Sequence, residues 1–256
     1  MTATSMTATI VTTKPIAPSI HYPSGDGQPL AETFDHVYVI LVTIAVLRHY
    51  FRAEQVCVLG NQFLYYAQGF PKLRCAPDVM VIFGVEPGSR DNYKIWEEGE
   101  VPRVVFEMTS PGTKKEDDGS KKQLYEQLGI QEYWQFDPRG EWIPEKLRGY
   151  QLVGDSYQPI ETGISQALGL RLEPHGAIIS FYQLDTGEKL LIMDELYEQS
   201  EDRKLELMEE RLQLQAERSQ LKQVEAELMQ QRSTTEDLQQ QLDRYREHFG
   251  ELLDES

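Results

Sequence analysis

The final part of the chain contains no residue that breaks a helix. From Asp194 onward glycine is absent until Gly250 and proline does not occur, while Glu, Gln, Leu and Arg dominate the composition. Glycine and proline are the residues least compatible with a helix interior, and a segment rich in the other four is typical of a long helix. The sequence therefore predicts a helical segment over residues 194–256, distinct from the domain that precedes it.

Apolar residues in this segment recur at alternating spacings of three and four. The main seam consists of Leu221, Val224, Leu228, Gln231, Thr235, Leu238, Leu242, Tyr245 and Phe249. This spacing is typical of a coiled coil, so we expect the chain to form a homodimer or a higher oligomer. Leu205, Met208 and Leu212 follow a different phase, which predicts a phase break near residues 213–220. A single exposed, charged helix is the alternative.

The rest of the chain is long enough for one sizeable core domain. The chain has 256 residues, 40% of them hydrophobic, and a formal net charge of −17. Residues 194–256 account for −10 of that charge and the preceding residues for −7. A surface without a broad basic face does not bind polyanions unaided, so a nucleic-acid substrate would require metal ions or a local basic patch.

The N-terminal residues and the cysteines indicate the compartment of the protein. Residues 1–29 are expected to be a disordered lead, because they begin with a Thr-, Ala- and Pro-rich stretch that lacks the apolar core of a signal peptide. The longest apolar stretch, Val37–Leu47, is too short to cross a membrane. Cys57 and Cys75 lack metal-ligand spacing and fit a reducing compartment. We therefore expect a cytoplasmic protein without a membrane segment, in which residues 30–193 form the folded domain.

Residues 30–193 mix helical and strand-like patterns, which predicts an α+β domain. A helix is expected over Thr33–Phe51 because the apolar pattern is long, although its β-branched residues also fit a strand. A second helix is expected over Ser120–Leu128, after a polar loop at residues 111–119. One strand each is expected at residues 56–66, 77–85, 103–108 and 130–136, and hairpins are expected from the runs at residues 148–153, 157–160 and 178–184.

Two carboxylates interrupt apolar strand patterns. Glu107 lies within the apolar run Val104–Met108, and Asp78 precedes a similar run that ends at Phe83. A carboxylate in a buried strand is costly unless a partner compensates its charge, so the two acids can converge on one cation. Mg²⁺ prefers oxygen ligands and retains several waters, so Asp78, Glu107 and the carbonyl of Met108 suffice as a candidate ligand set. A solvent-facing Asp78 and a structural salt bridge at Glu107 are the alternatives.

A candidate cationic group follows in the second predicted helix. Lys121 and Lys122 lie in its first turn, where the helix dipole disfavours positive charge, so another interaction would have to favour them there. A lysine beside a metal can orient the attacking water or neutralise charge that develops on a phosphate. Tyr125 lies one turn after Lys121 and either faces the same cleft or packs with a solvated hydroxyl. Lys121 as a surface lysine and Asp117 as an exposed loop residue are the alternatives. The histidines at positions 21, 36, 49, 175 and 248 show no ligand spacing and are assigned no metal role.

The residues around these groups resemble a known family. In chain order, the motifs that carry the resemblance are Ala76–Val81, Val105–Thr113, Asp117–Tyr125, Gly129–Trp134 and Asp137–Pro138. Together they are similar to the restriction-endonuclease family that is present in many copies in some bacterial genomes and belongs to the PD-(D/E)XK nuclease superfamily. The resemblance is specific across residues 76–138, extends more weakly toward residues 30 and 195, and does not include the helical tail.

The resemblance implies a restriction-endonuclease-like core, with a central mixed sheet and flanking helices, that cleaves DNA with Mg²⁺ or, in its place, Mn²⁺. Asp78 and Glu107 match the two acids of the family. The lysine of the superfamily usually stands two residues after the second acid, where this chain has Thr109. Within the family that role is taken from the following helix, here by Lys121 or else by Lys122. The expected function is a metal-dependent DNA endonuclease that dimerises through the coiled coil, and a catalytically inactive oligomeric scaffold that binds a partner protein is the alternative.

Overall fold

A computed structural model describes residues 20–27, 32–110 and 112–250. Most of the expected disordered lead, residues 1–29, lies outside the described residues. In its described part the ring of Tyr22 contacts the rings of Tyr65 and Trp96, so this segment packs against the domain that follows. The chain divides into two compact units, Met1–Met193 and Asp194–Ser256.

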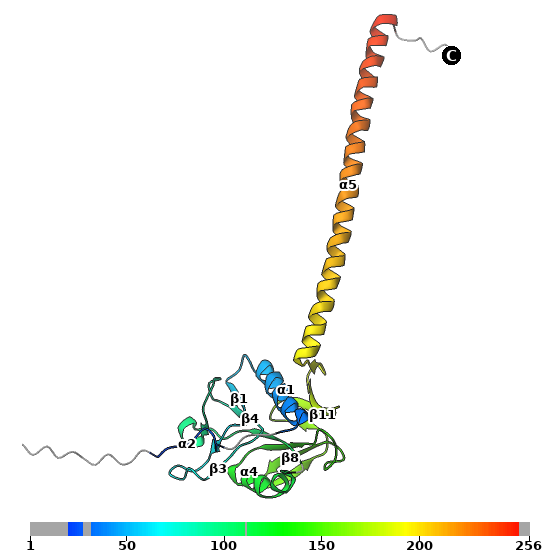
Figure 1. Ribbon diagram of the computed structural model, residues 1–256. Helices are drawn as coiled ribbons and strands as arrows, with labels where there is room; N and C mark the ends of the chain where they lie inside the picture. Colours follow the sequence, from blue (N-terminus) through cyan, green and yellow to red (C-terminus); the bar gives the residue numbers. More distant parts are fainter. Residues whose placement is uncertain (1–19, 28–31, 111, 251–256) are drawn as a thin grey trace, which may run out of the picture. The chain divides into compact units, whose positions relative to one another are not determined.

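The first unit is built on a six-stranded sheet with the strand order β1-β4-β6-β7-β8-β9 (Figure 1). Its strands are β1 Val56–Gly60, β4 Val79–Phe83, β6 Val104–Met108, β7 Glu132–Phe136, β8 Leu147–Val153 and β9 Ser156–Ile160. β6 and β7 are parallel, and the other neighbouring pairs are antiparallel. Parallel neighbours need a crossover connection, and the helical segment between β6 and β7 provides it. The expected α+β class with a central mixed sheet is confirmed.

Two smaller sheets complete the unit. One contains β10 Ile164–Ser165, β11 Leu170–His175, β12 Ile178–Gln183 and β13 Lys189–Leu190, and the other contains β2 Leu64–Tyr65, β3 Arg74–Cys75 and β5 Tyr93–Lys94. A short helix, α2, follows β5 over Ile95–Glu98. The expectation of one strand over residues 56–66 is wrong, because β1 and β2 belong to different sheets. Asn61 causes the separation, since its left-handed backbone (φ 50°) turns the chain between the two strands.

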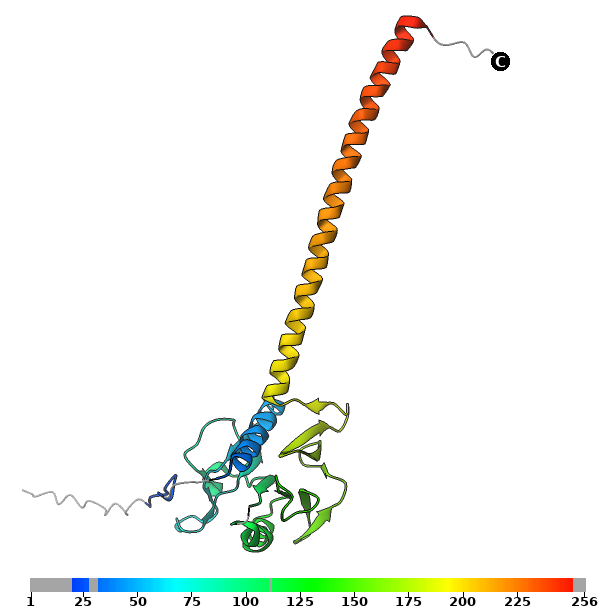
Figure 2. The ribbon, with the colours of Figure 1, turned by 45° about the vertical axis from the view of Figure 1, so that its right-hand side comes forward.

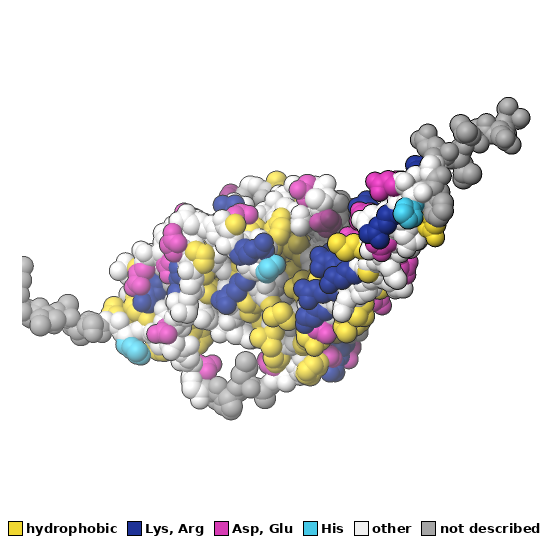
Figure 3. Space-filling model, turned by 90° about the horizontal axis from the view of Figure 1, so that it is seen from above, with side chains coloured by type: hydrophobic (Ala, Val, Ile, Leu, Met, Phe, Trp, Pro, Cys, Tyr) yellow, Lys and Arg dark blue, Asp and Glu magenta, His cyan; other side chains and the backbone are white. Residues whose placement is uncertain are grey.

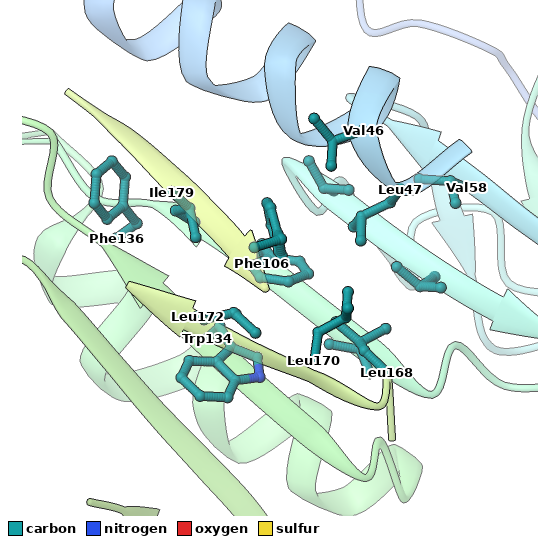
Figure 4. Packing of buried hydrophobic residues seen from close by; sticks show 14 of the residues in the cluster. Val46, Leu47, Val58, Phe106, Trp134, Phe136, Leu168, Leu170, Leu172 and Ile179 are labelled. Carbon is teal, nitrogen blue, oxygen red and sulfur yellow. The ribbon is translucent and has the colours of Figure 1, made fainter. Parts of the chain in front are cut away.

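Both faces of the sheet are buried at its central strands β4, β6 and β7, which explains the uninterrupted apolar runs in β4 and β6. Side chains alternate between the faces, so Phe106 packs on one side and Val105 on the other. Helix α1, Phe34–Tyr50, covers the first face together with β11 and β12, and Figure 4 shows Leu47 and Leu170 beside Phe106 there. On the opposite face Val105 packs with Tyr125 of the crossover segment.

The crossover segment becomes helical earlier than the sequence predicts. Helix α3 begins at Lys114, a π-helical turn follows over Asp117–Lys121, and α4 continues over Lys122–Leu128. Helix begins within the segment that the sequence assigns to a polar loop, and the expectation that this loop stays outside the core is wrong for Asp117, whose side chain is buried. The sequence pattern is misleading at this residue because Asp117 meets the ammonium of Lys121 inside the protein instead of solvent.

The second unit consists of α5, a single helix over Met193–Phe249 (Figure 1 and Figure 2). The expected long helix is confirmed, and it continues without a break through residues 213–220, where the seam changes phase. Seam residues Leu221 and Leu228 are exposed in the single chain, so the coiled coil stays a prediction about association. Among the helices in the described parts of the chain, none is both long and apolar enough to span a membrane.

Candidate active site

The register of two strands places Asp78 opposite Glu107. β4 and β6 pair antiparallel with Val79 opposite Phe106, so the next pair outward is Asp78 with Glu107. Directly opposite residues of an antiparallel pair project to the same face of the sheet, with Cβ atoms roughly 5 Å apart. The structure therefore brings together the two acids that the sequence singles out.

Glu107 is enclosed by groups from the crossover segment. Only 1% of the residue is exposed. Its Oε2 accepts a hydrogen bond from Nζ of Lys121 at 2.9 Å, and its Oε1 accepts one from the hydroxyl of Tyr125 at 2.5 Å. The alternatives of a surface lysine and of a solvated tyrosine hydroxyl are therefore both wrong, because each group is directed at the buried carboxylate.

The π-helical turn brings a third acid to the same place. Asp117, Lys121 and Tyr125 are spaced by four residues, so they follow one another along one side of the helical segment. Oδ1 of Asp117 lies 3.1 Å from Nζ of Lys121, and the residue is only 1% exposed. Among the described residues, neither oxygen of Asp117 receives a hydrogen bond of good geometry. Lys121 is thus shared between two buried carboxylates.

Asp78 is the most exposed of the three acids, and its carboxylate is held by a hydrogen bond to the backbone. Its Oδ2 accepts a hydrogen bond from the backbone N–H of Met108 at 2.6 Å, and its Oδ1 lies 3.7 Å from Nε2 of His36. The N–H of Thr109 points the other way, toward the carbonyl of Phe136 in β7. Because the N–H and C=O of one strand residue point to the same side, the Met108 carbonyl is directed toward the side of β4 that carries Asp78.

The cluster contains more negative than positive charge. Burial, and then the charge of Asp78, raise the pKa of Glu107 to about 8 even though Lys121 opposes the shift. Burial also raises the pKa of Asp117. Burial lowers the pKa of Lys121, but Glu107 and Asp117 outweigh this effect, so its pKa is raised and the ammonium stays charged. Three acids beside one lysine leave a deficit of about two positive charges when all are ionised, which a divalent cation would neutralise.

The comparisons with known proteins agree with the motifs. Residues 15–179 match the family Uma2, whose description is "Putative restriction endonuclease". The chain belongs to the Uma2 family. It is also similar to a solved structure from Anabaena variabilis ATCC 29413 titled "a putative nuclease belonging to DUF820", with 13% identity, a TM-score of 0.40, and coverage of 57% of this chain and 81% of that chain. No curated protein matches the chain.

In this member of the Uma2 family, the donor groups at the cluster suit a hard divalent cation. Asp78, Glu107 and the Met108 carbonyl are oxygen donors, which Mg²⁺ and Mn²⁺ accept. Within the described parts of the chain, no three His, Cys, Asp or Glu side chains are grouped closely enough to hold a metal by themselves. A cation at this place would therefore complete its coordination with the Met108 carbonyl, waters and substrate oxygens, as Mg²⁺ commonly does.

Sequence patterns alone do not identify every residue of the cluster in this Uma2 chain. His36 comes from α1, and Asp117 carries no strand-like signal of burial. Burial, and then the charge of Glu107, raise the pKa of the nearby Cys75 thiol to about 12, so the thiol stays protonated at neutral pH. Lys122, the second candidate lysine, lies elsewhere, with its Nζ 3.5 Å from the centroid of the Tyr150 ring.

Proposed function

We propose that this protein is a divalent-metal-dependent endonuclease that hydrolyses phosphodiester bonds in DNA. The observation that carries the proposal is that the buried carboxylates of Glu107 and Asp117 share one ammonium group, that of Lys121, while Asp78 lies opposite Glu107 on the neighbouring strand. Such a cluster is unfavourable in the isolated protein, and the deficit of positive charge gives it a reason to bind a cation. Membership of the Uma2 family supports the nuclease assignment.

Each residue has a proposed role in the reaction. Asp78 and Glu107, with the carbonyl of Met108, would hold Mg²⁺ or Mn²⁺. The bound cation would supply an acidified water and a counter-charge for the substrate phosphate. Lys121 would donate a hydrogen bond to the attacking water or to a phosphate oxygen, since its side chain is partly exposed and its ammonium already lies 2.9 Å from Glu107. Tyr125 would keep Glu107 in place through the bond from its hydroxyl.

The surface gives the protein little passive affinity for DNA. On the face shown in Figure 3, Lys and Arg side chains form small groups between acidic and apolar side chains. The chain as a whole carries a net charge of −17. Because phosphate contacts dominate nucleic-acid affinity, binding here would depend on cations at the cluster and weaken with salt. Binding should therefore be tested in low salt and with the divalent ion present.

Cleavage of supercoiled plasmid by the purified protein with Mg²⁺ or Mn²⁺ tests the proposal. Asp78→Asn, Glu107→Gln and Lys121→Met should each abolish metal-dependent nicking, whereas Glu161→Gln, which changes an exposed acid, should not. An RNA substrate of matched length determines which nucleic acid is cut. If no nucleic acid is cleaved with either metal while an oligomer persists, the scaffold alternative is favoured over the nuclease.

We also propose that α5 joins two copies of the chain and that residues 30–193 form the nuclease domain. Seam residue Leu228 and its off-seam neighbour Met229 are both exposed, which provides a matched pair of variants. Leu228→Glu should convert the oligomer to a monomer in light scattering coupled to gel filtration, and Met229→Glu should not. Equal masses for wild type and Leu228→Glu would contradict the predicted seam.

A further inference from the structure

His36 is a buried histidine whose surroundings are not those of a simple core residue. It lies in the first turn of α1, where Thr33 accepts a hydrogen bond from its backbone N–H at 3.4 Å. The residue is only 6% exposed. Its Nδ1 has no hydrogen-bond partner among the described residues, so the ring is not held by that nitrogen. The orientation of the imidazole must come from the other side of the ring.

The other side of the ring faces the acidic cluster. Nε2 lies 3.7 Å from Oδ1 of Asp78 and 3.9 Å from Oε2 of Glu32. Oδ2 of Asp78 accepts the Met108 N–H, and Oδ1 faces the imidazole at a distance longer than a hydrogen bond. A carboxylate at the start of a strand has several accessible rotamers. The Met108 N–H on one oxygen, together with charge attraction from the nearby imidazole on the other, favours one of them.

We infer that His36 is a positioning residue for the cation site, holding the Asp78 carboxylate in the orientation that faces Glu107. This inference rests on the proposed function of the cluster. His36 acts through Asp78, since His36, Asp78 and Glu107 do not form a three-ligand group among the described residues. Ligating carboxylates are commonly oriented by an outer hydrogen-bond partner, and loss of that partner typically costs about 10- to 100-fold in metal affinity.

Replacement of His36 by two different side chains separates positioning from core filling. His36→Leu keeps most of the buried volume and removes every donor, whereas His36→Gln keeps an N–H that can reach Asp78. His49→Leu is the matched control, because His49 lies at the other end of the same helix and is exposed. The readouts are Mn²⁺ affinity by calorimetry and the melting temperature in EDTA.

The expected result is a loss of Mn²⁺ affinity of about 10- to 100-fold in His36→Leu. His36→Gln should recover most of this loss, and His49→Leu should bind as the wild type does. Wild-type affinity in His36→Leu would overturn the inference alone. The inference would also be overturned if His36→Leu and His36→Gln lost the same Mn²⁺ affinity and both had a lower melting temperature. His36 would then serve only to fill the core. A wild type that binds no Mn²⁺, or an Asp78→Asn variant that binds it unchanged, would instead overturn the proposed cation site together with this inference.

Discussion

Replacing Glu107 by glutamine should make the metal-free protein more tolerant of high pH. The carboxyl group is buried, and burial together with the charge of Asp78 raises its pKa from 4.5 to about 8. Glutamine has nearly the same shape but no ionisable proton, so it removes the pH dependence of this position. The substitution also weakens the bond from Lys121, which changes the free energy of unfolding by a constant amount. The pH dependence of the variant then comes from the other ionisable groups.

The size and sign of the effect follow from the two pKa values. The folded-state pKa lies above the unfolded value, so the folded protein binds the proton more tightly than the unfolded chain does. Its stabilising effect is complete below pH 4.5 and is lost as the pH rises to about 8. A difference of about 3.5 between the pKa values corresponds to about 5 kcal/mol as an upper limit, because water entry and local relaxation reduce it.

Urea unfolding of wild type and Glu107→Gln between pH 5 and pH 9 in EDTA measures this difference. The three tryptophans all lie before residue 194, so their fluorescence reports on the first unit and not on α5. The free energy of unfolding of the variant relative to wild type should rise by as much as about 5 kcal/mol across this range and then level off. Glu161→Gln, at an exposed acid, should show no such rise. Parallel curves for wild type and Glu107→Gln would refute the reasoning, because Glu107 would then be ionised throughout.

Three further changes test the surroundings of the cluster and the core. Tyr125→Phe removes a hydrogen-bond donor to Glu107, so the pKa of Glu107 should rise by about one unit. The loss of unfolding free energy that Glu107 causes should then extend to a pH about one unit higher, and an unchanged pH range would contradict the role of that bond. Gly149→Ala places a Cβ 2.5 Å from the Trp134 ring and should cost about 1–3 kcal/mol in urea unfolding, and a neutral result would show that the ring can move aside. Asp137→Asn weakens a carboxylate that accepts four backbone N–H bonds from residues 139–143 and should lower the free energy of unfolding by about 1–3 kcal/mol, with retained stability as the contrary result.

The sequence was sufficient to select two of the three acids of the cluster. Glu107 stands out because a carboxylate inside an apolar run needs compensation, and Asp78 stands out because it begins the run of a neighbouring strand. Both acids are recognised from their neighbours in the sequence, so knowledge of the fold is not needed to select them. Lys121 and Lys122 stand out more weakly, because the helix dipole disfavours a cation in the first turn, and the family motifs give Lys121 its expected role. The metal that these residues would hold stays a prediction.

The long helix was also readable from the sequence. Helix formation depends on the backbone and on nearby side chains, and the segment from Asp194 to Phe249 contains neither glycine nor proline. The β1–β2 break and the early start of the crossover helix were not readable. Asn61 adopts a left-handed backbone that its residue type permits but does not require, and Asp117 is buried because it meets Lys121 in the fold.

The composition of the cluster was decided by tertiary structure. Strand pairing between β4 and β6 sets Asp78 opposite Glu107, and the crossover connection lays Asp117 and Lys121 over the same face of the sheet. His36 reaches Asp78 from a helix that starts more than forty residues earlier, a proximity that no sequence spacing encodes. The sequence determined which groups are costly to bury, because that cost is a property of each side chain and its neighbours. Only the fold decided which of them share one place, because charge interactions depend on distance in space.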